Sequence, residues 1–278
     1  MLTTIRSGFA GLQTFIAGVA VSLVAILAAL PAEAQEGNWA GFYAGVNAGG
    51  AWGNSDTNIG CDDSTFAFGP FCRLATAQRA IPFNMSTDQD GFIGGVQAGY
   101  NFQRGHMVFG IEADIAWTSI DGSQSVTTAP TLNFPTGNDS RVSQKLNYLG
   151  TVRGRLGYAM HNNFLLFATG GLAYGDVDNR YAFEFQTVGG SATASQSKTK
   201  TGWTVGGGGE YSFGHWSLKG EYLYYDLGEE RLSGQFIDAV NGPQNVYLNP
   251  KFETKGQLVR VGLNFKFGHR ADAPVPLK

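Results

Sequence analysis

The stretch Met107–Thr118, MVFGIEADIAWT, alternates between apolar side chains and small or polar ones. One parity carries Phe109, Ile111, Ile115 and Trp117, whereas the other carries glycine, glutamate and aspartate. Successive side chains of a β-strand point to opposite faces, so this alternation predicts a strand between an apolar and a polar environment.

The same period of two recurs along the chain in segments of about ten residues, a length typical of membrane-spanning strands. With the first stretch they make eight segments: 42–52, 92–103, 107–118, 146–158, 164–175, 203–213, 216–224 and 259–267. Segment 164–175, FLLFATGGLAYG, is apolar on both parities, so the sequence does not orient it.

The connections between these segments alternate in length. Tight turns lie at Arg104–His106, Met160–Asn163 and Gly214–His215, and the long connections are Gly53–Gln89, Ser119–Ser143, Asp176–Lys200 and Gly228–Thr254. Short periplasmic turns and long extracellular loops are typical of transmembrane barrels, whereas a soluble β-sandwich would scatter its loop lengths. The prediction is an all-β fold, an eight-stranded antiparallel transmembrane up-and-down β-barrel.

Aromatic side chains support a membrane location because most of them fall at segment ends, on the apolar parity. Two interfacial girdles of aromatic residues are typical of such barrels. The predicted girdle residues are Trp39, Phe42, Trp52, Tyr100, Phe102, Trp117, Tyr148, Tyr158, Trp203, Tyr211, Phe213, Trp216, Tyr222, Tyr224, Phe265 and Phe267.

The N-terminus has the pattern of an export signal. Arg6 precedes a mostly apolar stretch and the small-x-small site Ala32–Ala34, which predicts a signal peptide over residues 1–34 with cleavage before Gln35. The apolar run Val19–Leu30 is shorter than the roughly 20 residues of a membrane anchor. The predicted organisation is signal peptide 1–34, outer-membrane barrel 35–267 and a short tail 268–278.

The polar parity of the predicted strands carries nine charged residues. A charge on the lipid face would be costly, so we expect them to face the barrel interior. Eight strands leave an interior just wide enough for side chains, which favours ion pairs that close it over a narrow diffusion channel. The predicted interior charges are Glu112, Asp114, Arg153, Arg155, Glu210, Lys219, Glu221, Arg260 and Lys266.

Only two cysteines occur, Cys61 and Cys72, both in the first long connection. Exported proteins fold in an oxidising compartment, which predicts a disulfide between them. No metal, cofactor or catalytic site is predicted: histidines fall at the turn end, and Asp62-Asp63 is a solvated pair rather than a hydrolase dyad. A barrel enzyme therefore remains the weaker alternative.

Composition and loops bear on partners. The net charge is −3, which gives no basic footprint for nucleic acid. The expected partners are outer-membrane lipid, lipopolysaccharide, the barrel-assembly machinery and a host or envelope partner at the outer loops. Loop aromatics that would suit such recognition are Phe66, Phe68, Phe71, Phe134, Phe183, Phe185, Phe236 and Tyr247.

Several strings of the mature chain are familiar. WAGFYAGVNAGGAWG (39–53), FATGGLAYG (167–175), GWTVGGGGEYSF (202–213), WSLKGEYLYYDLG (216–228) and VRVGLNFKF (259–267) make the chain similar to alphaproteobacterial outer-membrane immunogenic proteins, small opacity-type porins. The resemblance implies a surface-exposed, antigenic outer-membrane barrel that contributes to envelope integrity. Such barrels commonly end on an aromatic residue, whereas here the tail 268–278 follows Phe267.

Overall fold

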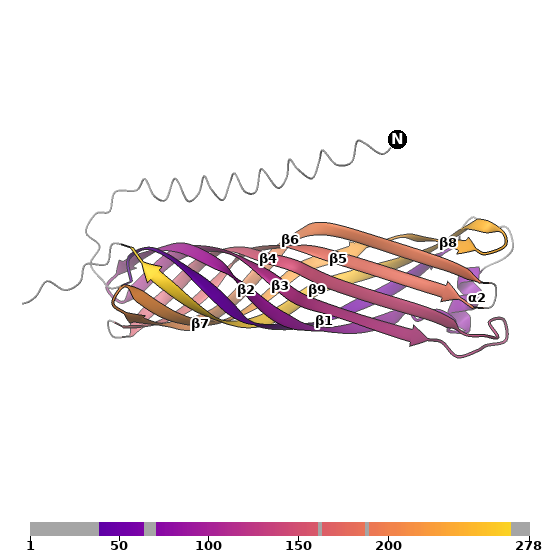
Figure 1. Ribbon diagram of the computed structural model, residues 1–278, viewed down its shortest axis with the longest axis horizontal. Helices are drawn as coiled ribbons and strands as arrows, with labels where there is room; N and C mark the ends of the chain where they lie inside the picture. The colour runs from indigo at the N-terminus through magenta and orange to yellow at the C-terminus, as the bar shows by residue number, and fades with distance from the viewer. Residues whose placement is uncertain (1–38, 64–70, 161–162, 187–188, 268–278) are drawn as a thin grey trace, which may run out of the picture.

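The computed structural model describes residues 39–63, 71–160, 163–186 and 189–267; the predicted signal peptide and C-terminal tail lie outside them. The described residues form one antiparallel barrel whose last strand pairs with its first (Figure 1). Its elements are β1 (Gly41–Asp62), α2 (Phe71–Ala77), β2 (Asn84–Arg104), β3 (Met107–Thr127), β4 (Asn138–Met160), β5 (Phe164–Phe185), β6 (Gly190–Phe213), β7 (Trp216–Arg231), β8 (Gly234–Asp238) and β9 (Gly242–Lys266).

The ring has the predicted eight positions although the sheet contains nine strands. Consecutive strands pair antiparallel, and β1 closes onto β9 with Ala44 opposite Phe265. The short β8 continues the line of β7, because both pair with β9 on one side and with β6 on the other. The fold prediction of an eight-stranded up-and-down barrel is confirmed.

The strands are about twice as long as the sequence predicted. β1 to β6 and β9 contain 21 to 25 residues each, so most of the four predicted long connections continue the wall of the barrel. In β2, for example, Met85, Thr87 and Gln89 point inward while the residues between them face water. In these outer parts of the strands, serine, threonine and glutamine occur on both faces. The hydropathy of successive residues therefore shows little alternation.

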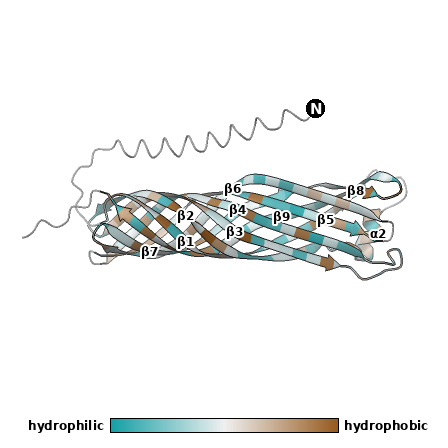
Figure 2. Ribbon diagram, viewed as in Figure 1, coloured by the Kyte–Doolittle hydropathy of each residue, from teal (hydrophilic) through white to brown (hydrophobic). Residues whose placement is uncertain are grey.

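The outer surface divides into two zones along the strands (Figure 2). In the half that carries the short turns, large apolar side chains are exposed, and in β2 this band runs from Phe102 to Phe92. At about 3.3 Å per residue and the usual strand tilt, the height of this band matches the roughly 25 Å apolar band of a barrel in a bilayer. The outer half of the wall is mainly polar and projects beyond the band. Within the described ranges, no helix has the length and apolar character needed to cross a membrane.

Candidate functional site: the barrel interior

All nine predicted interior charges lie inside the barrel. Each has an exposed fraction of 7% or less, and Lys219, Arg153 and Arg260 are at 0%, 1% and 1%. Strand alternation positions them, because every one is on the parity opposite to the lipid-facing apolar residues. Together they hold four acidic and five basic side chains at the level of the membrane.

Arg153 is the centre of this charge network and contacts three carboxylates. Its Nη2 pairs with Glu112 and, at 2.9 Å, with Oδ2 of Asp114, while its Nη1 donates to Oε2 of Glu221 at 2.9 Å. Glu112 and Asp114 come from β3, the neighbour of β4, and Glu221 comes from β7, across the lumen. One guanidinium therefore ties two walls of the barrel together through charge-assisted hydrogen bonds.

Arg260 and Lys219 complete the same cluster. The Nη1 and Nη2 atoms of Arg260 donate to the two oxygens of Asp114 at 3.0 and 2.9 Å, and its Nε donates to Glu221 at 2.7 Å. Lys219 Nζ lies 2.8 Å from Glu112 and 3.0 Å from Glu221. Three cations and three carboxylates thus neutralise one another with no net charge left over.

Arg155 and Glu210 form a separate ion pair nearer the turn end. Arg155 also lies over the ring of Phe167, with 3.9 Å between its Cζ and the ring centroid. Glu210 accepts further hydrogen bonds from Ser217 and Asn264, the latter at 2.9 Å. The pair is held between an aromatic ring and two neutral donors, away from water.

Lys266 and Trp39 close the interior at the turn end of the barrel, beyond the Arg155–Glu210 pair. Lys266 donates to Ser212 and lies 5.3 Å from the centroid of the Trp39 ring. Trp39, predicted to lie in the lipid-facing girdle, is instead 2% exposed and packs with Val108 and neighbouring apolar residues inside the barrel. That prediction was wrong because Trp39 falls on the inward parity of the first strand, with Tyr43 and Asn47, and not on the outward parity of Val46 and Trp52.

Neutral partners of the network were missed at the sequence level. Tyr43 donates to Glu112 at 2.6 Å, Thr151 donates to Asp114 at 2.6 Å, and Gln97 links Asn264 to Asn47. All lie on the inward parity, so the same pattern that selected the charges would have found them. Tyr43 and Thr151 add neutral hydrogen bonds to carboxylate oxygens that also accept from the cations, and Gln97 extends the network to two amides.

Small inward residues make room for these long side chains. A Cβ atom on Gly99 would lie 2.4 Å from the hydroxyl of Tyr43, and one on Gly208 would lie 2.9 Å from Cα of Glu221. The previously unoriented β5 contributes Leu165, Phe167 and Thr169 to the interior. The high glycine content therefore serves the packing of a filled lumen.

Above the network the lumen is filled by two apolar layers separated by a polar one. The lower apolar layer includes Ile120, Leu149 and Leu258. The polar layer contains Gln144, which hydrogen-bonds to Asn179 and Thr254 at 2.7 and 2.9 Å. The outer apolar layer is Ile59, Cys72, Ala75, Ala80, Ile81, Met85, Phe134, Val142, Tyr181, Phe183, Phe185, Ala192, Ala194, Leu232, Phe236, Val246, Leu248 and Phe252.

This outer layer corrects the interpretation of the loop aromatics as a recognition surface. Phe134, Phe183, Phe185 and Phe236 are 0–6% exposed and pack against one another and against Phe71. Phe183, Phe185 and Phe236 are inward residues of a wall that extends further than predicted, and Phe134, in the connection between β3 and β4, packs onto Phe185. Tyr247 alone of the described set is at the surface, 36% exposed, and the two predicted residues at positions 66 and 68 lie outside the described ranges.

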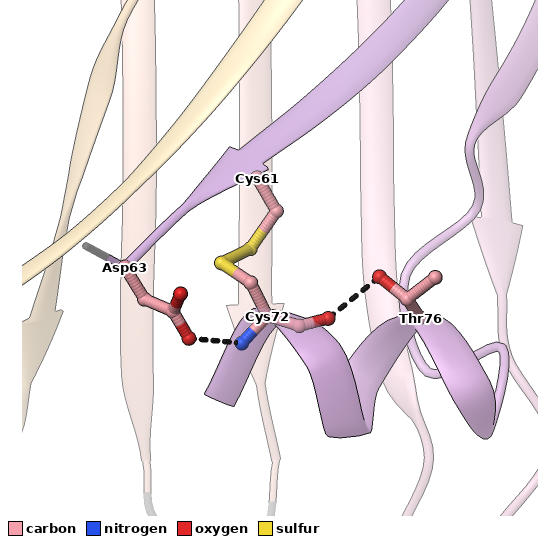
Figure 3. Close-up of a disulfide and its surroundings, with 4 residues drawn as sticks. All are labelled: Cys61, Asp63, Cys72 and Thr76. Carbon is pink, nitrogen blue, oxygen red and sulfur yellow. Dashed lines mark hydrogen bonds between the residues drawn. A yellow bond between two sulfur atoms is a disulfide. The ribbon is translucent and has the colours of Figure 1, made fainter. Parts of the chain in front are cut away.

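The disulfide holds α2 in the mouth of the barrel (Figure 3). It joins Cys61 at the end of β1 to Cys72 in the helix, with 5.5 Å between their Cα atoms. Asp63 accepts a hydrogen bond of 2.7 Å from the backbone N–H of Cys72, one of the free donors of the first helical turn. Thr76 bonds back to the Cys72 carbonyl at 2.6 Å. The bridge therefore fixes the helix as a lid on the outer apolar layer.

The geometry offers little that resembles a reaction centre. No group of three or more His, Cys, Asp or Glu side chains that could hold a metal ion occurs among the residues described. Of the predicted turn histidines, His106 and His215 lie in the turns that follow β2 and β6. Asp63, one of the two adjacent loop acids, contacts the helix backbone rather than a nucleophile or base.

Comparison with known proteins then identifies the family. The profile described as "Outer membrane protein beta-barrel domain" matches residues 20–267. The chain belongs to this family. It is 37% identical over 235 residues to the 31 kDa outer-membrane immunogenic protein of Brucella melitensis, covering 83% of this chain and 84% of that one. It is 32% identical over 191 residues to a 22 kDa outer membrane protein of Rhizobium leguminosarum bv. viciae, covering 68% and 65%.

Among solved structures, the chain is similar to the outer membrane protein OprG of Pseudomonas aeruginosa, with a TM-score of 0.46, 14% identity and coverage of 84% and 99%. Family membership confirms the predicted resemblance and the outer-membrane location. The barrel is thus a surface protein of the outer membrane whose apolar band faces lipid and whose outer half projects from it.

Proposed function

We propose that this family member is a closed, non-conducting structural barrel that contributes to envelope integrity. The polar outer half of its wall, which projects beyond the apolar band, forms a rigid stalk above the membrane. The observation that carries the proposal is the burial of its interior cations. Arg153, Lys219 and Arg260 are 0–1% exposed, whereas a water-filled channel of the same charge content would wet them. Complete pairing is what makes such burial tolerable.

The layers above the network support closure independently. A solute that passed the charge network would next meet the apolar layers that include Leu258 and Phe185. The disulfide-anchored helix covers the outer end. The barrel and the stalk form one packed unit, because the long strands run through both.

A catalytic role receives no support from this arrangement. The buried carboxylates are each bound by at least one cation, and none is left free to act as a general acid or base. The proposed contacts are those of a structural protein: lipid and lipopolysaccharide at the wall, the assembly machinery during insertion, and a host or envelope partner at the outer end.

A solute-entry assay tests the proposal. Proteoliposomes that contain the purified protein should swell in arabinose no faster than protein-free liposomes, because the lumen has no path for a sugar. A general porin in parallel liposomes serves as the positive control. Swelling that scales with the amount of this protein would establish a diffusion channel instead.

A further inference from the structure

The outer wall of the stalk carries a shallow pocket across β4, β5 and β6. It has a volume of about 380 Å³ and includes Arg141, Ser143, Arg180, Thr193 and Ser195 in its lining. Tyr181, Ala182 and Ala194 complete the lining; the side chains of Tyr181 and Ala194 point into the lumen, so the apolar part of the outer face is the small side chain of Ala182.

Strand register explains why a pocket forms here. Ala182 lies opposite Arg141 on one side and Thr193 on the other, while Arg180 lies between Ser143 and Ser195 in the next row. The small side chain of Ala182 leaves a depression, which the two arginines and three hydroxyl groups surround. Arg141 and Arg180 are diagonal neighbours on adjacent strands, a geometry with roughly 7–8 Å between the residues.

The two guanidinium groups are available for a ligand. Both arginines are exposed, and neither guanidinium makes an ion pair or a hydrogen bond with another residue in the described ranges. Like charges on diagonal positions repel unless an anion lies between them. An arginine fork also matches the oxygens of a phosphate, sulfate or carboxylate group.

Nearby acids lie outside the lining of the pocket, although Asp178 is two residues from Arg180 on the same face of β5 and interacts with it electrostatically. In the row toward the membrane, Asp178 lies opposite Lys145 and accepts a hydrogen bond of 3.0 Å from Asn147. In the row away from the membrane, Asp139 accepts hydrogen bonds from Thr127 and Gln186 at 2.6 and 3.0 Å.

Glu184 is the remaining acid of that outer row. It is exposed, lies opposite Asp139 and is a diagonal neighbour of Arg141 on the side away from Arg180. The pocket itself is therefore lined by positive charge and hydroxyl groups, with acidic residues only beyond its rim.

We propose that this pocket binds an anionic saccharide, with the two arginines on its phosphate, sulfate or carboxylate group and the hydroxyls and the depression at Ala182 on the sugar. Its position suits a sugar: Arg180 lies eight residues beyond the lipid-exposed Leu172 on β5, or about 20 Å above the apolar band. At that height the stalk is surrounded by the sugars of the outer leaflet. The inference rests on the membrane placement and is independent of whether the lumen is closed.

Calorimetric titration of the purified barrel in detergent micelles tests the site. The probes are deacylated lipopolysaccharide core oligosaccharide with its phosphates, the same oligosaccharide after phosphatase treatment, and a sulfated heparin disaccharide. The test variant is Arg141→Gln/Arg180→Gln, and the matched control is Arg231→Gln, an exposed arginine of β7 outside the pocket. All three changes leave the packed interior intact, so heat-modifiable gel mobility should not change.

We expect at least one anionic probe to bind the wild type and the Arg231 control equally, and to bind the double variant at least about tenfold more weakly, since charge-assisted hydrogen bonds are lost. Higher salt should weaken the binding. Preference for the phosphorylated oligosaccharide, lost on phosphatase treatment, assigns the ligand to the cell's own leaflet; preference for the heparin disaccharide assigns it to an external glycan. Equal binding by wild type and double variant, or no binding of any probe, would overturn the proposal.

Discussion

The Arg155–Glu210 pair is the sharpest probe of a dry interior because it involves only one ion pair. In an Arg155→Met variant, the methionine keeps an apolar contact with the Phe167 ring, but Glu210 loses its ion pair with Arg155. Removing one partner of a buried pair costs about 3–5 kcal/mol. Glu210 keeps its hydrogen bonds from Ser217 and Asn264, so we expect the lower end, about 3 kcal/mol.

A second change should restore stability. Glu210→Gln in the same chain removes the stranded charge and keeps an oxygen for the Ser217 and Asn264 donors. We expect Arg155→Met/Glu210→Gln to lie within about 1 kcal/mol of the wild type, because neutral replacement of a buried pair is often nearly neutral in free energy. The second change would then recover about 2 kcal/mol of the loss caused by Arg155→Met.

Urea unfolding in phospholipid vesicles, followed by the fluorescence of the five tryptophans, measures these free energies. The matched control is Lys255→Met, which breaks the half-exposed Lys255–Glu253 pair and should cost less than about 1 kcal/mol. If Arg155→Met is no more destabilising than this surface control, and Glu210→Gln recovers nothing, the interior is wet and the reasoning fails.

Three further changes test other parts of the structure. Replacing Cys61 and Cys72 with serine should cost about 3 kcal/mol yet leave membrane insertion intact; failed insertion on fractionation would show that the bridge guides assembly. Phe185→Ala should cost about 3–5 kcal/mol in urea unfolding, and a cost below 1 kcal/mol would mean that the outer layer is loosely packed. Gly49→Ala should destabilise by at least about 1–3 kcal/mol, because its Cβ would lie 2.0 Å from a carbonyl oxygen of β9, whereas Gly50→Ala has open space; equal heat-modifiability of both variants would refute the register.

Period-two alternation predicted the most important part of the interior. In the strands of Arg153, Glu112 and Asp114, the alternate residues are apolar and face the lipid. A charge exposed to lipid is so costly that these three side chains must face the lumen. The partners within the network were beyond this reasoning. Arg153 meets Glu221 across the lumen, and that contact depends on strand tilt and register, which no local pattern specifies.

The stalk was missed because its strands resemble loops in composition. Between Gly190 and Lys200, β6 contains mainly serine, threonine, alanine and glutamine, so its outward face is polar and its inward alanines give little contrast. Phe183 and Phe185 fall two apart on the inward parity of β5, which was a readable signal. The two residues were nevertheless predicted to lie in a loop, because a membrane band needs only about ten residues per strand.

Conductance across a planar bilayer tests the closed lumen most directly, since ions are smaller probes than sugars. Purified wild-type protein, refolded and verified by its heat-modifiable mobility, should give no steady conductance steps over the bare membrane when the voltage is varied. This expectation rests on the packing of the cations Arg153, Lys219 and Arg260, which are 0–1% exposed. Reproducible ohmic steps whose number grows with the amount of inserted protein would contradict the closed barrel.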